Sequence, residues 1–568
     1  MLLKEVRIEN FRALKKVWVP LHVNNVLIGE NNAGKSTFLQ AIAFLFNAWR
    51  PQMEDIHRGP GESEVPRKRI LRVEGLIKPA NGTEFDDDVR NLLGDAVQIG
   101  RGAGEADWVA VRAELAWDEA HDEFRVNRRF LRGWVTTAPE AAEAVVTMPR
   151  PLFAGELAEL FNFYLLDARR DVVEQLRVRG SFWSRLVRDP DLSLEVAREI
   201  EGEIQGLNQR IVDESQVFAH VTGALREMEM AADQAAVGIV PIPQHLRELL
   251  PAMDITYAAR GAQSFPMANH GMGTRSWAAL LIFKAYVSWM REHGPRMDRH
   301  SLNMVGLEEP EAHLHPQAQR ALLRRLQEIQ GQKFISTHSP YICSRAEIDD
   351  MLIFRSEGGQ VSIKPFAAQD EFTAEQRQKV QRFVQTGHPE LLFSRVFLLV
   401  SGKTEEAALP VFAQEYYGGG ALDELGVSLV QVGGDDNFEP FIRAAQAAGI
   451  PWRALSDAET DPIRRTVDKV KQQVMRCGAA EENVIWLPDN NSWESYMVDN
   501  YRAEVEETIR ERRGTCSVEL LKELTGDKIN YGRLLAERIV SLDDPSRRIP
   551  ERVQALFRSI ETALGGGG

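Results

Sequence analysis

The residues most able to do chemistry lie in a glycine-rich stretch close to the start of the chain. The stretch reads GENNAGKST and matches the phosphate-binding pattern G-x-x-x-x-G-K-[ST]. Lys35 would reach the β- and γ-phosphates of a nucleotide such as ATP, and the hydroxyl of Ser36 would ligate Mg²⁺. Backbone N–H groups at the start of the following helix would bind phosphate oxygens. The residues expected to line the nucleotide are Gly29, Asn31, Asn32, Ala33, Gly34, Lys35, Ser36 and Thr37.

Two adjacent carboxylates form a second motif that suits nucleotide hydrolysis. Residues 304–310 read MVGLEEP, an apolar strand that ends in paired acids. One carboxylate suits the Mg²⁺ shell and the next suits polarising the attacking water. We assign Glu308 to the metal and Glu309 to the water. Paired acids also occur at ordinary strand ends, but the phosphate-binding stretch upstream favours the catalytic interpretation.

Two weaker signals accompany these motifs. His338 follows a short apolar strand in the segment FISTHSP and could touch the γ-phosphate, although a lone histidine is usually structural. The segment GMGTRS, residues 271–276, precedes an apolar helix expected over residues 277–287. A glycine-rich turn at a helix start can bind an anion from a neighbouring subunit. Its candidate contacts are Gly271, Gly273 and Thr274.

The second half of the chain places acidic residues after predicted strands. Apolar strands over residues 396–400, 427–432 and 452–455 alternate with helices, which predicts a parallel α/β sheet. Acids at the carboxyl ends of such strands converge on one crevice, and clustered carboxylates hold Mg²⁺ or Mn²⁺. Two such ions can clamp both the attacking and leaving oxygens of a phosphodiester. Solvated loop acids in an acidic protein are the alternative. The acids concerned are Glu405, Asp457 and Glu459.

Length and composition set the broad class. At 568 residues the chain is too long for one core, so two or more domains are expected. No apolar run is long enough to span a bilayer, and the start shows no signal-peptide pattern. Three cysteines without metal or disulfide spacing predict a reducing, cytoplasmic location. The net charge of -15 argues against a uniformly DNA-coating surface, but it leaves room for a local basic groove.

The elements that must position these residues can be outlined from periodicity. Strands are expected within residues 2–19 and a buried helix over residues 38–46, after the phosphate-binding stretch. Between residues 204 and 228, apolar side chains recur at three- and four-residue steps, which predicts an amphipathic helix or helix pair. Such a helix could pack on its own lobe, or it could be an insertion that pairs two subunits.

Taken in order, GENNAGKST, HGMGTRS, GLEEPEAHLHP and STHSP resemble the ATPase head of the overcoming-lysogenization-defect (OLD) family. That head is similar to the ABC-type heads of SMC-like DNA-repair proteins. The resemblance implies that two subunits sandwich ATP between one phosphate loop and the other subunit's signature turn, residues 271–276. It also implies that Glu309 is the hydrolytic carboxylate and His338 the switch histidine.

The second half, roughly residues 392–564, resembles a Toprim domain, the metal-binding fold of topoisomerases, primases and OLD nucleases. Glu405 and Asp457 match the family's acids, and Glu459 replaces an aspartate. Ser401 stands where the family has a glutamate; a hydroxyl is a neutral, weak ligand and cannot act as a carboxylate base.

Two later residues also resemble members of the Toprim site of OLD nucleases. Glu494 resembles the late acidic metal ligand, and Lys528 resembles the late lysine. A lysine near the cleaved phosphate could stabilise developing charge.

The sequence therefore predicts an α/β chain with an ABC/SMC-like ATPase head followed by a Toprim domain. The head would comprise residues 1–180 and 251–365, with a helical dimerisation insertion over residues 181–250. A linker, residues 366–391, would precede the parallel Toprim sheet of residues 392–568.

The predicted activity is ATP-regulated, metal-dependent DNA cleavage, in anti-phage defence according to the resemblance. The chain would form a homodimer or tetramer through its heads, with a helicase-like partner as in the Gabija system. The alternative is an ATP-dependent DNA-binding clamp or sensor that does not cut, because Ser401 replaces the glutamate. A primase or topoisomerase is disfavoured because no zinc-finger cysteines accompany the Toprim half.

Overall fold

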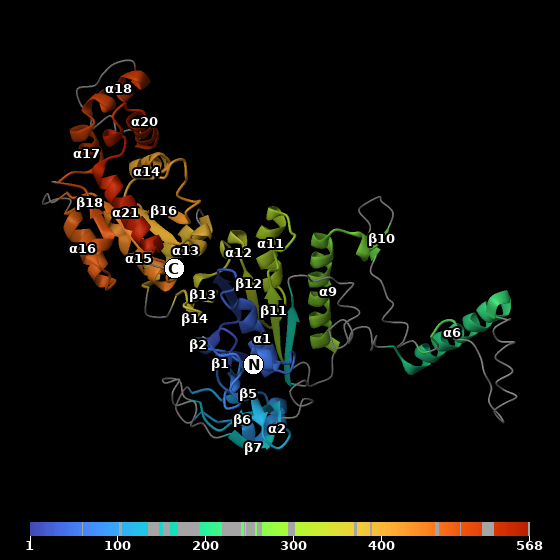
Figure 1. The fold of residues 1–568 in the computed structure, drawn as a ribbon. Helices are drawn as coiled ribbons and strands as arrows, with labels where there is room; N and C mark the ends of the chain where they lie inside the picture. The colour runs from blue at the N-terminus through green and yellow to red at the C-terminus, as the bar shows by residue number, and fades with distance from the viewer. Residues whose placement is uncertain are drawn as a thin grey trace, which may run out of the picture. The chain divides into compact units, whose positions relative to one another are not determined.

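The computed structural model divides the chain into two compact units (Figure 1). The first comprises Met1–Leu165, His300–Glu311 and Pro316–Gly568, and the second comprises Leu166–Arg299 and Ala312–His315. The residues that the structure describes are 1–59, 61–100, 105–134, 147–151, 160–167, 192–218, 240–243, 245, 256–257, 264–293, 301–367, 372–386, 389–459, 465–488, 490–513 and 528–565.

An antiparallel sheet with the strand order β2-β1-β4-β5-β6-β7 forms one layer of the first unit. Its first two strands confirm the strands predicted within residues 2–19. A short helix, α2 (Asp87–Leu93), lies between β4 and β5 in sequence. The strands are β1 (Leu2–Phe11), β2 (Leu14–Pro20), β4 (Leu71–Lys78), β5 (Val109–Asp118), β6 (Glu123–Leu131) and β7 (Thr147–Pro151).

A second sheet, ordered β14-β13-β3-β12-β11-β8, carries the nucleotide motifs. Strand β3 pairs in parallel with β12 and β13, and β12 pairs in parallel with β11. The carboxyl ends of these strands therefore share one edge, as in other parallel sheets. The strands are β3 (Asn24–Gly29), β8 (Phe161–Leu166), β11 (Leu302–Glu308), β12 (Gln332–Thr337), β13 (Met351–Glu357) and β14 (Gln360–Pro365).

Helix α1 (Lys35–Leu45) lies between the two sheets and begins directly after the phosphate-binding stretch (Figure 1). It contacts β1, β4 and β5 of the first sheet and β3 and β12 of the second. After its polar first turn, its side chains are apolar except for Gln40, as expected for a helix covered on both sides, and Phe38, Ile42 and Phe44 are fully buried. The first unit also contains the helices α11 (Pro316–Gln327), α12 (Pro340–Cys343) and α13 (Ala374–Thr386).

The second unit contains α6 (Leu194–Glu214), the two short strands β9 (Thr256–Tyr257) and β10 (Phe265–Pro266), and α9 (Met272–His293). Helix α6 confirms that a helix runs through Ile204 and Leu207; the later stripe positions 221, 225 and 228 lie outside the described residues. Helix α9 begins five residues before its predicted start. Residues 272–276 are therefore its first turn, not a separate glycine-rich turn.

The last part of the first unit is built on a four-stranded parallel sheet, ordered β16-β15-β17-β18, which confirms the predicted parallel α/β fold. Strand β15 is buried along its whole length because helices cover it. None of the helices within the described ranges is both long and apolar enough to cross a membrane. The elements are β15 (Val396–Val400), α14 (Lys403–Tyr416), β16 (Val427–Gln431), α15 (Phe438–Ala447), β17 (Trp452–Ser456), α16 (Thr466–Arg476), β18 (Val484–Trp486), α17 (Trp493–Asn500), α18 (Arg502–Arg513), α20 (Lys528–Val540) and α21 (Glu551–Gly565).

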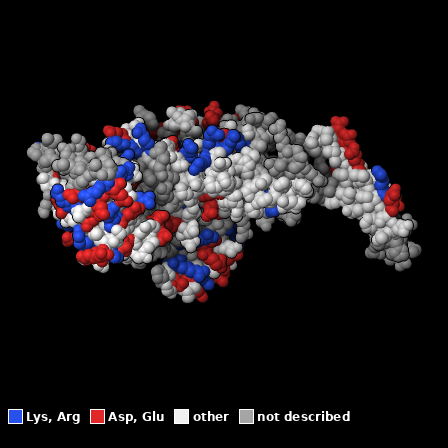
Figure 2. Space-filling view, turned by 90° about the horizontal axis from the view of Figure 1, so that it is seen from above, with Lys and Arg blue, Asp and Glu red and all other residues white. Residues whose placement is uncertain are grey.

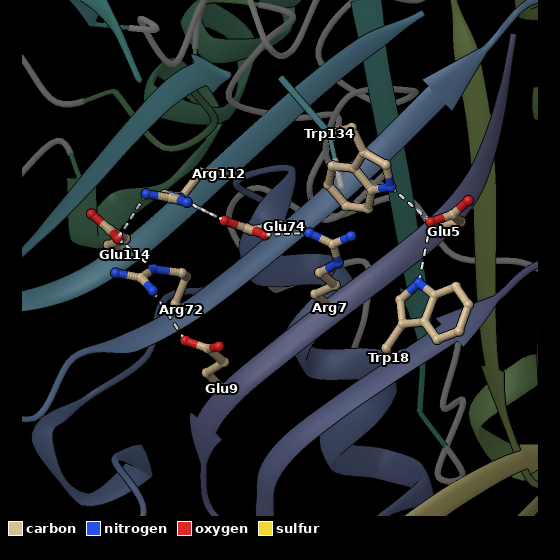
Figure 3. Close-up of polar contacts among 9 residues, drawn as sticks. All are labelled: Glu5, Arg7, Glu9, Trp18, Arg72, Glu74, Arg112, Glu114 and Trp134. Atoms are coloured by element: carbon tan, nitrogen blue, oxygen red, sulfur yellow. Dashed lines mark hydrogen bonds and ion pairs between the residues drawn. The ribbon is translucent and has the colours of Figure 1, made fainter. Parts of the chain in front are cut away.

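One face of the antiparallel sheet carries a buried ionic network (Figure 3). Glu74 on β4 lies directly opposite Arg7 on β1 and Arg112 on β5, and all three are buried. Arg112 Nε donates to Glu74 Oε1 at 2.6 Å, and Arg7 Nη1 lies 3.7 Å from Glu74 Oε2. The Arg7 guanidinium also lies over the ring of Trp134. Opposite charges at directly paired positions stabilise neighbouring strands against one another.

Candidate functional site

The phosphate-binding stretch connects β3 to α1 by a tight turn. Asn32 and Gly34 have φ values of 63° and 91°, in the left-handed region, so that α1 starts at the next residue, Lys35. A side chain on Gly29 would place its Cβ 2.4 Å from the carbonyl oxygen of Phe354 on β13. Only glycine therefore fits at Gly29. The N–H groups of the first turn of α1 have no partner within the helix and can bind an anion.

Lys35 is buried within this turn. Its Nζ donates to the carbonyl oxygens of Gly29 and Glu30, both at 2.8 Å. Burial lowers the pKa of Lys35 to about 8, and the nearby carboxylates of Glu309 and Glu311 partly offset this effect. Ser36, next along the chain, is exposed at the helix start, so its hydroxyl is accessible to a metal ion. The arrangement suits Lys35 and Ser36 to bind phosphate and metal.

The paired acids lie at the end of β11, beside the turn. Glu308 is the last residue of the strand, and Glu309 follows it with a φ of 43°, a strained conformation for a residue other than glycine. The Glu309 N–H donates to the carbonyl oxygen of Ser336 on β12, at 2.9 Å. His338 Nε2 lies 4.0 Å from Glu309 Oε1. Burial, followed by the charge of Lys35, lowers the pKa of His338, so the imidazole is neutral near pH 7.

A third acid, Glu311, was missed in the sequence. Its Oε1 accepts hydrogen bonds from Thr337 Oγ1 at 2.6 Å, His338 N at 2.9 Å and Ser339 N at 3.1 Å. Burial raises the pKa of Glu311, and these donors lower it in part. Glu311 thus fixes the segment that carries His338 relative to Glu309. The signal available in the sequence was a third carboxylate two residues after the paired acids.

The predicted signature residues lie in the second unit, at the start of α9. The carbonyl oxygen of Gly271 accepts the N–H groups of Thr274 and Arg275, as expected in a first helical turn. A Cβ on Gly273 would lie 2.5 Å from the carbonyl oxygen of His313, so this glycine is required by packing within its own chain. Contact of Gly271, Gly273 and Thr274 with the phosphate of another subunit stays a prediction.

The acids of the second half converge after the parallel strands. Ser401 follows β15 and Glu405 lies in the first turn of α14; both are buried. Ser401 Oγ donates to Glu405 Oε1 at 3.3 Å. A Cβ on Gly402 would lie 2.4 Å from Glu405 Oε2, so the glycine leaves room for the carboxylate to fold back toward the strand end.

Asp457 and Glu494 approach from the neighbouring elements. Asp457 follows β17, and its Oδ1 accepts the N–H of Trp493, the first residue of α17, at 2.9 Å. Glu494 Oε1 accepts a hydrogen bond from Thr404 Oγ1 at 2.9 Å. Lys528, the first residue of α20, places its Nζ 3.3 Å from the same oxygen of Glu494. The structure thus brings together acids from three separated segments and one lysine.

Like charges dominate this site. Burial is the largest effect and raises the pKa of Glu405 and of Asp457, and Glu494 raises the pKa of both further. Asp435, in the turn after β16, also raises the pKa of Asp457. Asp435 is not among the predicted site residues, although it follows a strand end as Asp457 does. Lys528 offsets part of the repulsion on Glu405.

This donor set fits a divalent cation by its chemistry. Hard carboxylate oxygens are the ligands that Mg²⁺ and Mn²⁺ prefer, and a cation would relieve the mutual repulsion of Glu405 and Asp457. Among the described residues, no group of three or more His, Cys, Asp or Glu side chains has a geometry that could hold a metal ion. Glu405, Asp457 and Glu494 are the residues that would hold the ion. Glu459 is not among the strongest charges acting on Asp457.

Comparison with protein families finds two matches along the chain. Residues 1–87 and 193–343 match the family described as "AAA ATPase domain". Residues 392–458 match the family described as "Overcoming lysogenization defect protein-like, TOPRIM domain". The two matched regions contain the phosphate-binding stretch and the acids Glu405 and Asp457, respectively.

Similar proteins span most of the chain. An "OLD nuclease" from Thermus scotoductus is 23% identical over 82% of this chain and 84% of its own length. An "Endonuclease GajA" from Bacillus cereus is 22% identical over 75% of this chain and 71% of its own length. An "Old nuclease" from Escherichia phage P2 is 23% identical over 80% of this chain and 77% of its own length.

Solved structures are similar to parts of the chain. An SMC head bound to a domain of ScpA covers 64% of this chain and 97% of its own, with a TM-score of 0.37 and 14% identity. The C-terminal region of the OLD protein of Xanthomonas campestris covers 31% of this chain and 96% of its own, with a TM-score of 0.25 and 21% identity.

Proposed function

Because the chain joins an AAA-type ATPase domain to an OLD-like Toprim domain and is a relative of the OLD nucleases, we propose that it is an ATP-regulated, metal-dependent DNA endonuclease. The observation that carries this proposal is the convergence of Glu405, Asp457 and Glu494 beside Lys528 at the end of the Toprim strands. Buried carboxylates that all carry negative charge suit a site that binds a cation together with a phosphodiester.

The residues of the Toprim site have separable tasks in this proposal. Glu405 and Asp457 bind the metal ion, and Glu494 completes the acidic set while it orients Lys528. The Lys528 ammonium stabilises negative charge that develops on the cleaved phosphate. When bound, Mg²⁺ or Mn²⁺ supplies Lewis-acid activation of the phosphodiester and of water.

In the ATPase domain, the proposed tasks follow the geometry of the turn. Lys35 and the loop N–H groups bind the phosphates, and Ser36 and Glu308 hold the Mg²⁺ ion that accompanies ATP. Glu309 polarises the attacking water, and neutral His338 donates toward the γ-phosphate. Gly271, Gly273 and Thr274 of a second copy close the nucleotide site.

The proposed setting is cytoplasmic, in anti-phage defence, as a homodimer or tetramer assembled through the ATPase heads. The defence role and a helicase-like partner follow from the family resemblance in the sequence, and the similarity to the protein named Endonuclease GajA supports the endonuclease activity. Light scattering with and without ATP tests the assembly. A strict monomer under both conditions would contradict the shared nucleotide site.

A second candidate function is favoured by Ser401. Its hydroxyl donates to Glu405, so the position contributes a neutral donor where a carboxylate would contribute charge. The chain would then be an ATP-dependent DNA-binding clamp or sensor that does not cut.

Plasmid nicking with Mg²⁺ or Mn²⁺, with and without ATP, separates the two candidates. For the endonuclease, we expect weak cleavage by the wild-type chain, a gain in Ser401→Glu, most visible with Mn²⁺, and loss when Asp457→Ala is added. Asp423→Ala, an exposed acid after α14, serves as the matched control. A folded Ser401→Glu protein that binds DNA without any gain in cleavage supports the clamp. Cleavage that survives Asp457→Ala would place the chemistry elsewhere.

A further inference from the structure

A segment of the ATPase domain is strongly basic in a chain that is otherwise acidic. The whole chain has a formal net charge of -15, whereas residues 312–346 contain five lysines and arginines and a single acid, Glu328. This segment includes α11, β12 and α12. The basic residues are Arg320, Arg324, Arg325, Lys333 and Arg345.

Two of these arginines are neighbours on α11, and a third follows α12, which contacts α11. Arg320 and Arg324 lie four residues apart on α11, so their side chains are neighbours on the same helix face. The Arg320 guanidinium lies 5.0 Å from the ring centroid of Tyr341 on α12, and this contact joins the two helices. Arg345 is exposed just after α12. Figure 2 shows Lys and Arg side chains gathered where Figure 1 places α11 and α12.

The remaining basic residues of the segment are already engaged. Arg325 pairs with Glu328 at 3.3 Å, and Lys333 is buried, with its Nζ donating to the carbonyl oxygen of Gly331. By contrast, within the part of the chain that the structure describes, no carboxylate lies within ion-pair distance of Arg320, Arg324 or Arg345. We call these three residues the arginine surface.

Several exposed arginines elsewhere in the described part of the chain pair with a carboxylate. Arg502 pairs with Glu506 and Arg533 with Glu537 on helices of the Toprim part, and Arg125 pairs with Glu123 on β6. Others, such as Arg198 and Arg210 on α6, have no such partner among the described residues. The arginine surface is distinguished by placing three unpaired guanidinium groups on α11 and just after α12, two helices that contact one another.

We propose that the arginine surface binds the phosphate backbone of duplex DNA; this inference rests on the proposed function and locates a DNA contact outside the Toprim acids. Guanidinium groups stay charged at all relevant pH values and bind phosphate in a bidentate manner. The Tyr341 ring limits the freedom of Arg320, so less side-chain entropy is lost on binding. A protein with net negative charge needs such a local patch to approach a polyanion.

The position of the surface also links it to the nucleotide site. Helix α11 begins seven residues after Glu309, and α12 begins two residues after His338. DNA bound on these helices would contact the elements that directly follow the segments of Glu309 and His338. The DNA contact is therefore expected to affect ATP hydrolysis as well as affinity.

The test measures binding of a labelled DNA duplex of about 30 base pairs over a range of salt concentrations. The full-length variant Arg320→Ala/Arg324→Ala/Arg345→Ala should bind at least about 10-fold more weakly at low salt, with the slope of log K against log salt reduced by about 2 to 3. Its ATP hydrolysis without DNA should be unchanged, and stimulation or inhibition by DNA should be lost.

Two further variants make the test specific. Arg125→Ala/Arg502→Ala/Arg533→Ala removes the same charge from arginines that have acidic partners, and its affinity and slope should stay near wild type. Arg320→Lys/Arg324→Lys/Arg345→Lys keeps the charge and should retain the salt slope, which separates lost charge from lost folding.

The outcomes distinguish this inference from the proposed function. A wild-type chain that does not bind duplex DNA contradicts the proposed function itself. A wild-type chain that binds, with affinity and slope unchanged in the triple alanine variant, overturns the arginine surface alone. Tighter binding of an RNA duplex of equal length through the same arginines would overturn the assignment to DNA.

Discussion

Two buried groups of charged residues in this chain differ in how their charges are balanced. On the antiparallel sheet, Glu74 lies between Arg7 and Arg112 (Figure 3). In the Toprim part, burial raises the pKa of both Glu405 and Asp457, Glu405 raises that of Asp457 further, and a third acid, Glu494, raises both. We refer to them as the sheet network and the acid cluster.

The difference indicates what each group is for. In the sheet network, neighbouring strands supply the compensating charge, so the group is complete within the chain. The acid cluster has more negative than positive charge in its immediate surroundings, since Lys528 offsets only part of the repulsion. Buried charges of one sign are costly unless an ion or ligand compensates them. The sheet network therefore stabilises the fold, whereas the acid cluster has the chemistry expected for the cation that we propose there.

The largest expected effect is on the sheet network. Glu74→Ala should lower the free energy of unfolding by about 3 to 5 kcal/mol, because Arg7 and Arg112 would stay buried without their shared carboxylate. Urea denaturation measures the change. Glu123→Ala, which removes an exposed partner of Arg125, is the control and should change stability by less than about 1 kcal/mol. A loss as small as the control's would show that the network is not structural.

The nucleotide site should show an effect of intermediate size. Its carboxylate Glu309 lies near both the charged Lys35 and the neutral imidazole of His338. Glu309→Gln should lower ATP turnover by about 100-fold or more, since the amide cannot polarise water as a carboxylate does, while ATP binding is kept. Lys35→Ala should weaken binding itself. Turnover and equilibrium nucleotide binding are measured side by side. Wild-type turnover in Glu309→Gln would refute its assignment.

Added metal should distinguish the two groups of charges directly. Mn²⁺ at about 100 times its dissociation constant should stabilise the nucleotide-free protein by about 2.7 kcal/mol relative to EDTA. Thermal unfolding reports this shift. The shift should vanish in Asp457→Ala and persist in Asp423→Ala. An equal shift in both variants would place the metal away from the acid cluster.

The smallest expected effect is a small increase in the free energy of unfolding, where most substitutions of buried residues would cause a decrease. In EDTA, Asp457→Asn should raise the free energy of unfolding by about 1 kcal/mol, because it removes one of several repelling charges and keeps the acceptor for Trp493 N–H. Glu74→Gln should lower stability under the same conditions. If both substitutions destabilise the protein, the negative charges of the acid cluster are already compensated within the chain. The proposed difference between the acid cluster and the sheet network would then be wrong.

The sequence was sufficient for the parts of the fold that depend on local pattern. The phosphate-binding stretch, the buried α1 and the parallel strands β15 to β17 all follow from spacing and apolar runs. The start of α9 was wrong by five residues, because apolar periodicity marks the buried middle of a helix and not its polar first turn. The order β14-β13-β3-β12-β11-β8 joins distant segments and could not be read from local pattern.

Some residues of the candidate site could be predicted from the sequence, and others could not. Glu405 and Asp457 converge because parallel strand ends share an edge, and Asp435 could have been added by the same reasoning. The sequence shows Glu311 as a third carboxylate but not its role, since its three hydrogen bonds reach a segment about 26 residues away in sequence. A metal-binding role for Glu459 stays a prediction.

The backbone of Glu309 has a consequence for protein engineering. Its φ of 43° is one that glycine or asparagine adopts at lower cost, by roughly 1 kcal/mol. Directed evolution for heat resistance alone would therefore favour replacement at this position, and each improved clone would lose the carboxylate that we propose activates water. A library built on this chain should hold codon 309 fixed or couple selection to ATP turnover.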